Sequence, residues 1–206
     1  HGIFSFGDTA RESYDRMITL VSRAERYLTR HAGKPSRAPR AKRDVSALRV
    51  DIARLRQDVS RHAGRPMILS TNQDASSLHF CGRHDLLRAS QRGPVTPDHV
   101  LRTKRIPLVG RAVDRFSGAY KSYFAIHEPH ARERKTMLDA APRVILDPVL
   151  GLCTIGTTAK EARVVEDIYR HTMDVIERAQ ALGGYRALPA RDIFDVRSEE
   201  HTSELQ

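Results

Sequence analysis

One stretch of this sequence occurs twice, and that repetition restricts the possible fold more than any other feature. Residues 1–12 read HGIFSFGDTARE, and residues 150–161 read LGLCTIGTTAKE. Five of the twelve positions are identical: two glycines, a threonine, an alanine and a glutamate. Self-similarity of this kind indicates two copies of one structural unit. The copies differ in kind at their first position, where His1 stands opposite Leu150.

Each copy predicts a short strand, a tight turn and a long helix. A short apolar run between glycines is typical of a buried strand. The Thr-x-x-Glu that follows is typical of a capping box, which satisfies the free amides at a helix start. Apolar residues at helical spacing then predict helices over 9–31 and 158–182. Their predicted inward faces are Ala10, Tyr14, Met17, Val21, Ala24 and Leu28 in the first helix, and Val164, Ile168, Val175 and Ala179 in the second.

Further elements are expected between the copies. Residues 33–43 are basic and rich in proline, which is typical of a solvated linker. The next helix has an apolar face of Leu48, Ile52, Leu55 and Val59, a start capped by Asp44 or Ser46, and an end at Gly64. We also expect strands at 66–70, 143–148 and 151–156, the last two pairing through the turn at 147–150, and helices at 85–90 and 111–127.

Several stretches resemble a known enzyme family. Residues 1–17 (HGIFSFGDTARESYDRM) resemble the end of the class II aldolase/adducin domain, where an HG turn precedes the last long helix. GPVTPDHVLRTKR, LDAAPR, VEDIYRHT and ALGGYRALPARDIFDV resemble the middle region of bifunctional rhamnulose-1-phosphate aldolase/short-chain dehydrogenases. The resemblance covers residues 1–196. It implies an α/β fold of class II aldolase/adducin type, with layers of short strands and long helices, a partial first unit and a degenerate second unit.

The resemblance also implies a domain order. Residues 1–32 would end a class II aldolase domain, 33–43 would be the linker, and 44–196 would be the degenerate aldolase-like region before a missing Rossmann-type dehydrogenase domain. Residues 197–206 (RSEEHTSELQ) are the codon-by-codon translation of a common sequencing-library adapter, so we expect them to be an artefact. On this interpretation the natural sequence is a fragment truncated at both ends.

A metal site is implied by the same resemblance. These aldolases bind a divalent metal, typically zinc, through three histidines, and the metal polarises the carbonyl of the substrate while a carbon–carbon bond breaks. His1 would be the third ligand, with the other two histidines and the catalytic glutamate lying before this sequence. A catalytic zinc needs three protein ligands, so we expect the chain alone to be inactive, and no catalytic residue is assigned within it. Leu150 predicts a structural role for the second unit.

The implied activity belongs to the parent protein. It is cleavage of rhamnulose 1-phosphate, or a similar ketose 1-phosphate, coupled to NAD-dependent oxidation of the aldehyde, as in rhamnose catabolism. The partners would be a phosphorylated sugar and other copies in a homo-oligomer, with NAD bound in the missing dehydrogenase domain. The sequence contains no Gly-x-Gly-x-x-Gly, so no NAD site is predicted within it. The alternative is a non-catalytic, adducin-like interaction or scaffold domain.

Two polar clusters each allow a functional and a structural interpretation. Thr96, His99, Arg102 and Lys104 surround a predicted helix start and would suit a phosphate or carboxylate, although capping and salt bridges are the preferred interpretation. His79, Cys81 and His84 have metal-like spacing but lack a second ligand pair, so helix packing is the preferred interpretation. The HEPH stretch at 127–130 is interpreted as a turn.

Composition excludes two classes of partner. The net charge is +10, but the basic residues are spread out and are not interleaved with aromatic residues, which argues against nucleic-acid binding. No run of about 18 apolar residues is present, so no membrane span is expected. The two cysteines, Cys81 and Cys153, make no disulfide framework and indicate a reducing cytoplasm.

Overall fold

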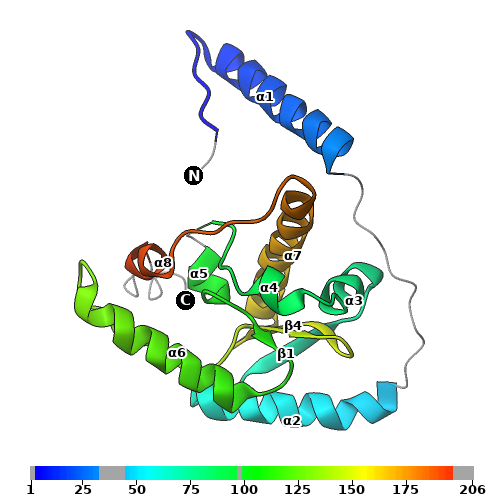
Figure 1. Ribbon diagram of the computed structural model, residues 1–206, viewed down its shortest axis with the longest axis vertical. Helices are drawn as coiled ribbons and strands as arrows, with labels where there is room; N and C mark the ends of the chain where they lie inside the picture. The colour runs from blue at the N-terminus through cyan, green and yellow to red at the C-terminus, as the bar shows by residue number, and fades with distance from the viewer. Residues whose placement is uncertain (1–2, 33–44, 97–98, 197–206) are drawn as a thin grey trace.

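A four-stranded sheet lies at the centre of residues 45–196 in the computed structural model (Figure 1). The structure describes residues 3–32, 45–96 and 99–196. The strand order is β1–β4–β3–β2, and β4 runs antiparallel to both of its neighbours, whereas β2 and β3 are parallel. The strands are β1 (Ile68–Asn72), β2 (Leu108–Val109), β3 (Val144–Asp147) and β4 (Gly151–Gly156).

The hairpin of β3 and β4 confirms the predicted pairing through the turn at 147–150. Val144 pairs with Thr154 and Asp147 with Gly151. The Asp147 carboxylate forms the turn by accepting hydrogen bonds from the amides of Val149 and Leu150, each at 2.8 Å. Every residue of both strands is buried, which explains why their sequences are almost continuously apolar.

Helices cover both faces of the sheet and confirm the expected α/β layers (Figure 1). One face packs against α2 (Val45–Ala63) and α6 (Val113–His127), and the other against α3 (Ala75–Cys81), α4 (Leu86–Ser90) and α7 (Ala159–Ala181). Side chains alternate along the strands, because successive residues point to opposite faces. Ile145 and Cys153 therefore join the α2–α6 side of the core, while Leu146 and Leu152 join the α7 side.

Helix α2 matches its predicted apolar face. Leu48, Leu55 and Val59 are buried, and Ile52 packs against them from a partly buried position. Gly64 has a φ of +68°, the left-handed conformation expected directly after a helix. The predicted caps cannot be compared, because Asp44 and the side chain of Ser46 lie outside the described residues.

Helix α7 has the predicted length, but its predicted inward face lies at the edge of the contact with the core. Val164, Ile168, Val175 and Ala179 are only partly buried, and of these Val175 and Ala179 pack against the core. Successive residues of a helix are rotated by about 100° around its axis. The residues that follow the predicted ones by one position therefore lie on a neighbouring stripe, and that stripe faces the sheet most directly. The larger Tyr169 and Met173 belong to that stripe and fill the space above the sheet. Its buried members are Ala162, Val165, Tyr169, Thr172, Met173 and Ile176.

Other boundaries also differ from the predictions. The strand expected at 66–70 is β1, two residues later, because Met67 turns into the core before pairing begins. The helical segment expected at 85–90 is α4, but β2 was not predicted. The end of the chain, interpreted as a tail, forms α8 (Ala190–Val196) with Ile193 and Phe194 buried. The remaining elements are α5 (Val100–Thr103) and the short helix η2 (Glu128–His130), which confirms a turn at HEPH.

Helix α1 (Ala10–His31) confirms the first predicted helix but has no buried residue. The strand predicted just before it is wrong: residues 3–7 have no strand conformation, and Phe4 and Phe6 are exposed. A strand needs a neighbouring strand to pair with its backbone groups, and none of the described strands does so. Residues 33–44, which connect α1 to α2, lie outside the described part of the chain.

The two copies share the same hydrogen bonds at their helix starts. Thr9 Oγ1 accepts from the Glu12 amide at 3.2 Å, and Thr158 Oγ1 accepts from the Glu161 amide at 3.1 Å. Each glutamate carboxylate accepts from the amide one residue before the cap, at 3.0 Å in the first copy and 2.7 Å in the second. Both predicted capping boxes are therefore present, with the return bond shifted by one residue.

Replacing Thr158 with alanine should lower the free energy of unfolding by about 1 kcal/mol, because the cap satisfies an amide of a helix packed on the sheet. Urea denaturation followed by circular dichroism measures this change. Thr9→Ala is the matched control: α1 buries nothing, so helix content should fall while the urea midpoint of the sheet-containing part stays the same. Equal shifts in midpoint for both variants would contradict this interpretation.

No helix within the described ranges is both long enough and apolar enough to cross a membrane.

Candidate functional site

Leu150 occupies the position in the second copy that His1 has in the first. It is fully buried in the core between the sheet and helices α2 and α6. Its backbone amide donates to Asp147, and its side chain lies in an apolar cluster. Nothing at this position can ligate a metal. His1 itself lies outside the described residues, so its predicted role as a ligand stays a prediction.

Next to Leu150, a charged network ties the hairpin to α2. The Arg111 guanidinium donates to the Asp147 carboxylate at 2.8 and 3.3 Å and to Asp51 at 2.6 Å. Burial raises the pKa of Asp147, but hydrogen bonds from Arg111 and from the turn amides outweigh it, so the net pKa is lowered. The hydrogen bond to Asp147 is the main cause of a raised pKa for Arg111. Two carboxylates enclose this cation, so we interpret the network as structural.

A second network links the end of β1 at Asn72 to α7. Arg170 donates to Glu166 at 3.0 Å and to Asp74 at 2.7 Å, and the Asn72 amide donates to Glu166 at 2.7 Å. Asp74 also caps α3 by accepting from the Ser77 amide. These side chains fasten α3 and α7 to the sheet edge, which is again a structural role.

The four residues of the predicted anion site do not face one place. The His99 ring lies 6.2 Å from the ring of His171 on α7, whereas the Lys104 amine lies 3.8 Å from the ring centroid of Tyr120 on α6. Thr96 accepts from the His99 amide at 3.2 Å, so a turn does begin at Thr96, although Pro97 and Asp98 lie outside the described residues. Arg102 is half-buried on α5. Anion binding by this set remains a prediction.

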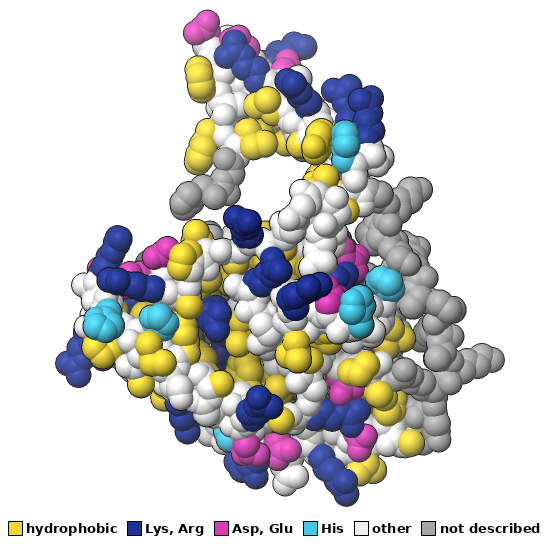
Figure 2. Space-filling model, viewed as in Figure 1, with side chains coloured by type: hydrophobic (Ala, Val, Ile, Leu, Met, Phe, Trp, Pro, Cys, Tyr) yellow, Lys and Arg dark blue, Asp and Glu magenta, His cyan; other side chains and the backbone are white. Residues whose placement is uncertain are grey.

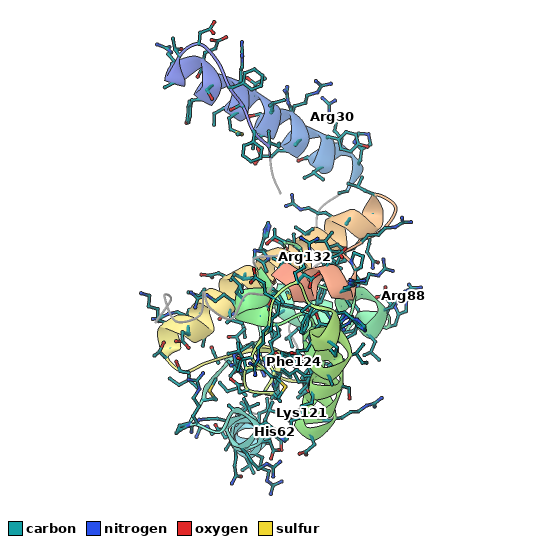
Figure 3. The ribbon with its side chains drawn as sticks, turned by 90° about the vertical axis from the view of Figure 1, so that its left-hand side faces the viewer. Arg30, His62, Arg88, Lys121, Phe124 and Arg132 are labelled. Carbon is teal, nitrogen blue, oxygen red and sulfur yellow. The ribbon has the colours of Figure 1, made fainter. Side chains whose placement is uncertain are left out.

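The His-x-Cys-x-x-His stretch also does not converge. Cys81 is buried in the core, and burial raises the pKa of its thiol to about 12. His84 is exposed, and His79 is partly buried on α3. Across residues 3–32, 45–96 and 99–196, no group of three His, Cys, Asp or Glu side chains is arranged to hold a metal ion. The histidine of HEPH that packs inward, His127, contacts the rings of Tyr123 and Phe194; Figure 3 shows the neighbouring Phe124 on the same helix.

A pocket of about 70 Å³ lies between α6 and the segment that follows α5. It is lined by Lys104, Arg105, Ile106, Phe116, Ala119, Tyr120 and Tyr123. Lys104 belongs to the anion site predicted from the sequence, whereas Arg105 and the two tyrosines do not. The available signal was weak: adjacent basic residues at 104–105, and aromatic residues three apart on one helix face.

Comparison with known proteins identifies the family. The family model "Aldolase class II, second domain" matches residues 46–197, which include the whole sheet and the helices on both of its faces. The chain belongs to this family. Its fold therefore agrees with the class II aldolase type expected from the sequence.

A relative adds information about the longer protein. The chain is 26% identical over 220 residues to a Bacillus subtilis (strain 168) protein named "Uncharacterized oxidoreductase YuxG". The match covers 95% of this chain but only 31% of that protein, so the chain spans about a third of the relative's length. No solved structure gives a significant match.

Class II aldolases generally depend on a divalent metal, but the described residues do not fit one. Leu150 fills the position equivalent to the predicted ligand, and its surroundings are apolar. No reaction step is therefore assigned to a metal held by the described residues of this second domain.

Proposed function

We propose that this chain is the second domain of a bifunctional sugar-catabolic enzyme that cleaves a ketose 1-phosphate, such as rhamnulose 1-phosphate. Cleavage breaks one carbon–carbon bond and gives a phosphorylated ketone and an aldehyde, which an NAD-dependent dehydrogenase domain then oxidises. The family match over residues 46–197 carries the proposal. The oxidoreductase name of the Bacillus subtilis relative, which is much longer than this chain, supports the second activity.

In this proposal the second domain is a supporting part, not a catalytic one. Its hairpin is buried, and Leu150 packs into the core where the first copy has His1. The metal, a divalent ion that we take to be zinc, would be held by His1 and two histidines from outside this sequence, and NAD would bind in a further domain. Cytoplasmic location and assembly into a homo-oligomer are parts of the same proposal.

The intact enzyme provides the test. Cleavage of rhamnulose 1-phosphate should require a metal, and His1→Ala should reduce it by roughly 100-fold or more, because a three-ligand site that loses one ligand loses its metal. His84→Ala is the control, since His84 is an exposed histidine in the second domain. The readout is the aldehyde released, with and without a chelator.

Two results would count against the proposal. Cleavage that survives His1→Ala unchanged would refute the ligand assignment. Failure of the intact protein to cleave any ketose 1-phosphate would favour the adducin-like interaction domain instead. One observation already favours that second candidate: several apolar side chains of α1, including Tyr14 and Tyr27, are exposed and would suit a protein contact.

A further inference from the structure

The pocket between α6 and the segment after α5 has an unusual lining. Of the described residues that line it, two (Lys104 and Arg105) are basic and none is acidic. Its walls are the rings of Phe116, Tyr120 and Tyr123 on one face of α6. Figure 2 shows this side of the molecule, where hydrophobic side chains gather next to α6 with a basic side chain among them. A small apolar pocket with convergent cations is a typical binding site for a charged group.

Arg105 is the first line of evidence. Its guanidinium lies 5.0 Å from the centroid of the Tyr123 ring, and burial lowers its pKa. Among the described residues no hydrogen bond or salt bridge to this guanidinium is observed; it lies over the Tyr123 ring instead. A partly buried cation without a counter-charge is unfavourable, so an anion entering the pocket would be stabilised.

The local charge balance points the same way. The Asp139 carboxylate lies 3.9 Å from the Lys104 amine, and it also pairs with Arg143 and, at 3.9 Å, with Arg65. Within the described ranges, three cations thus contact this one carboxylate, and Arg105 adds a further positive charge close by. An anion that entered the pocket would lower the repulsion between these cations.

Backbone geometry brings the two cations to the same pocket. Lys104 has φ +60° and ψ 176°, and it is the one non-glycine residue with positive φ in the described ranges. This conformation is strained for a residue with a side chain, and such strain tends to collect at functional sites. Side chains of adjacent extended residues normally point to opposite sides, yet Lys104 lies over the ring of Tyr120 and Arg105 over that of Tyr123.

We infer that this pocket binds a small oxyanion, a phosphate or carboxylate group, held mainly by Arg105 with Lys104 beside it. A guanidinium can donate two parallel hydrogen bonds to either group. The volume of about 70 Å³ admits one such group rather than a whole sugar. The site shares only Lys104 with the anion site predicted from sequence, and it does not depend on the proposed aldolase activity.

The test uses the full 206-residue chain and inorganic phosphate as the probe. Phosphate is titrated at constant ionic strength, with binding followed by calorimetry and by the NMR signals of the tyrosine rings. We expect saturable binding that shifts the signals of Tyr120 and Tyr123. Arg105→Gln should weaken it about tenfold or more, because the bidentate donor is lost. Arg115→Gln, which removes an equal charge from an exposed position of α6, should leave it unchanged.

Further arms separate the alternatives. A second titration uses acetate in place of phosphate, to decide whether the site prefers a carboxylate or a phosphate group. Binding of acetate at least as tightly as phosphate identifies a carboxylate site, and binding of phosphate alone identifies a phosphate site. Arg105→Lys keeps the charge and should retain part of the affinity if Arg105→Gln does not fold. The inference is overturned if wild-type chain gives no saturable response beyond that to chloride, or if Arg105→Gln and Arg115→Gln weaken binding equally. Neither result would bear on cleavage by the intact enzyme.

Discussion

Replacing Gly151 with alanine should lower the free energy of unfolding by about 3–5 kcal/mol, because it combines backbone strain with a direct clash. Gly151 has φ +76°, a conformation that residues with side chains rarely adopt. A Cβ added there would lie 2.1 Å from the carbonyl oxygen of Asn72, which belongs to the backbone of the paired strand β1. No rotation of a side chain can relieve that contact, so β1 would have to move away from β4.

Urea denaturation followed by circular dichroism measures the change. Gly118→Ala is the matched control, because Gly118 lies within α6 and an added Cβ would meet nothing within 4 Å. That variant should gain up to about 1 kcal/mol, since alanine is the better helix former. If Gly151→Ala were as stable as the wild-type chain, the close packing of β1 against β4 would not be required for stability.

Gly151 also shows what the sequence can predict. It is the second residue of the repeated unit, and in the second copy the repeat correctly predicts β4, the turn after it and the capped helix that follows. These features depend on residues within a few positions of one another, such as Thr158 and Glu161, so local sequence is sufficient. The hairpin of β3 and β4 is likewise predictable from local sequence, because both strands and their turn are continuous in the chain.

Features that depend on distant residues were harder to predict. The inward face of α7 was displaced by one residue, because apolar side chains occur on two neighbouring stripes and packing against the sheet selects between them. Strand β2 is only two residues long and exists because it pairs with β3, from a distant part of the chain. Helix α8 is short, and its position is set by contacts such as that of Phe194 with Tyr123.

The candidate sites show the same contrast between features that local sequence sets and features that depend on distant residues. The substitution of Leu150 for a histidine is visible in the repeat, and the buried position of Leu150 agrees with a structural second unit. The pocket at Arg105 could not be found from the sequence, because α6 supplies its aromatic walls from a separate segment. Only the folded chain places the Tyr123 ring against that guanidinium.

Replacing Asp147 with alanine should lower the free energy of unfolding by about 3–5 kcal/mol, because removal of one partner leaves a partly buried arginine without its main counter-charge. Asp147 is 5% exposed and accepts hydrogen bonds from Arg111 and from two amides of the hairpin turn. Asp147→Asn keeps an acceptor for those amides and should lose less. Urea denaturation at pH 7 measures both variants, and Asp114→Asn, at an exposed carboxylate of α6, should change the stability least.

The pH dependence separates the charge of Asp147 from its hydrogen bonds to the turn. Burial raises the pKa of this carboxyl, but bonds from Arg111 and the turn amides lower it more, so the folded pKa lies below the unfolded value of about 3.9. A lowered folded pKa stabilises the fold above the unfolded pKa, and that stabilisation is lost as pH falls through the folded pKa. The difference in stability between wild type and Asp147→Asn should therefore be constant above about pH 5 and shrink below pH 4. A difference that persists undiminished at pH 3 would assign it to neutral hydrogen bonds and packing, because the carboxylate would by then be largely protonated in the unfolded chain.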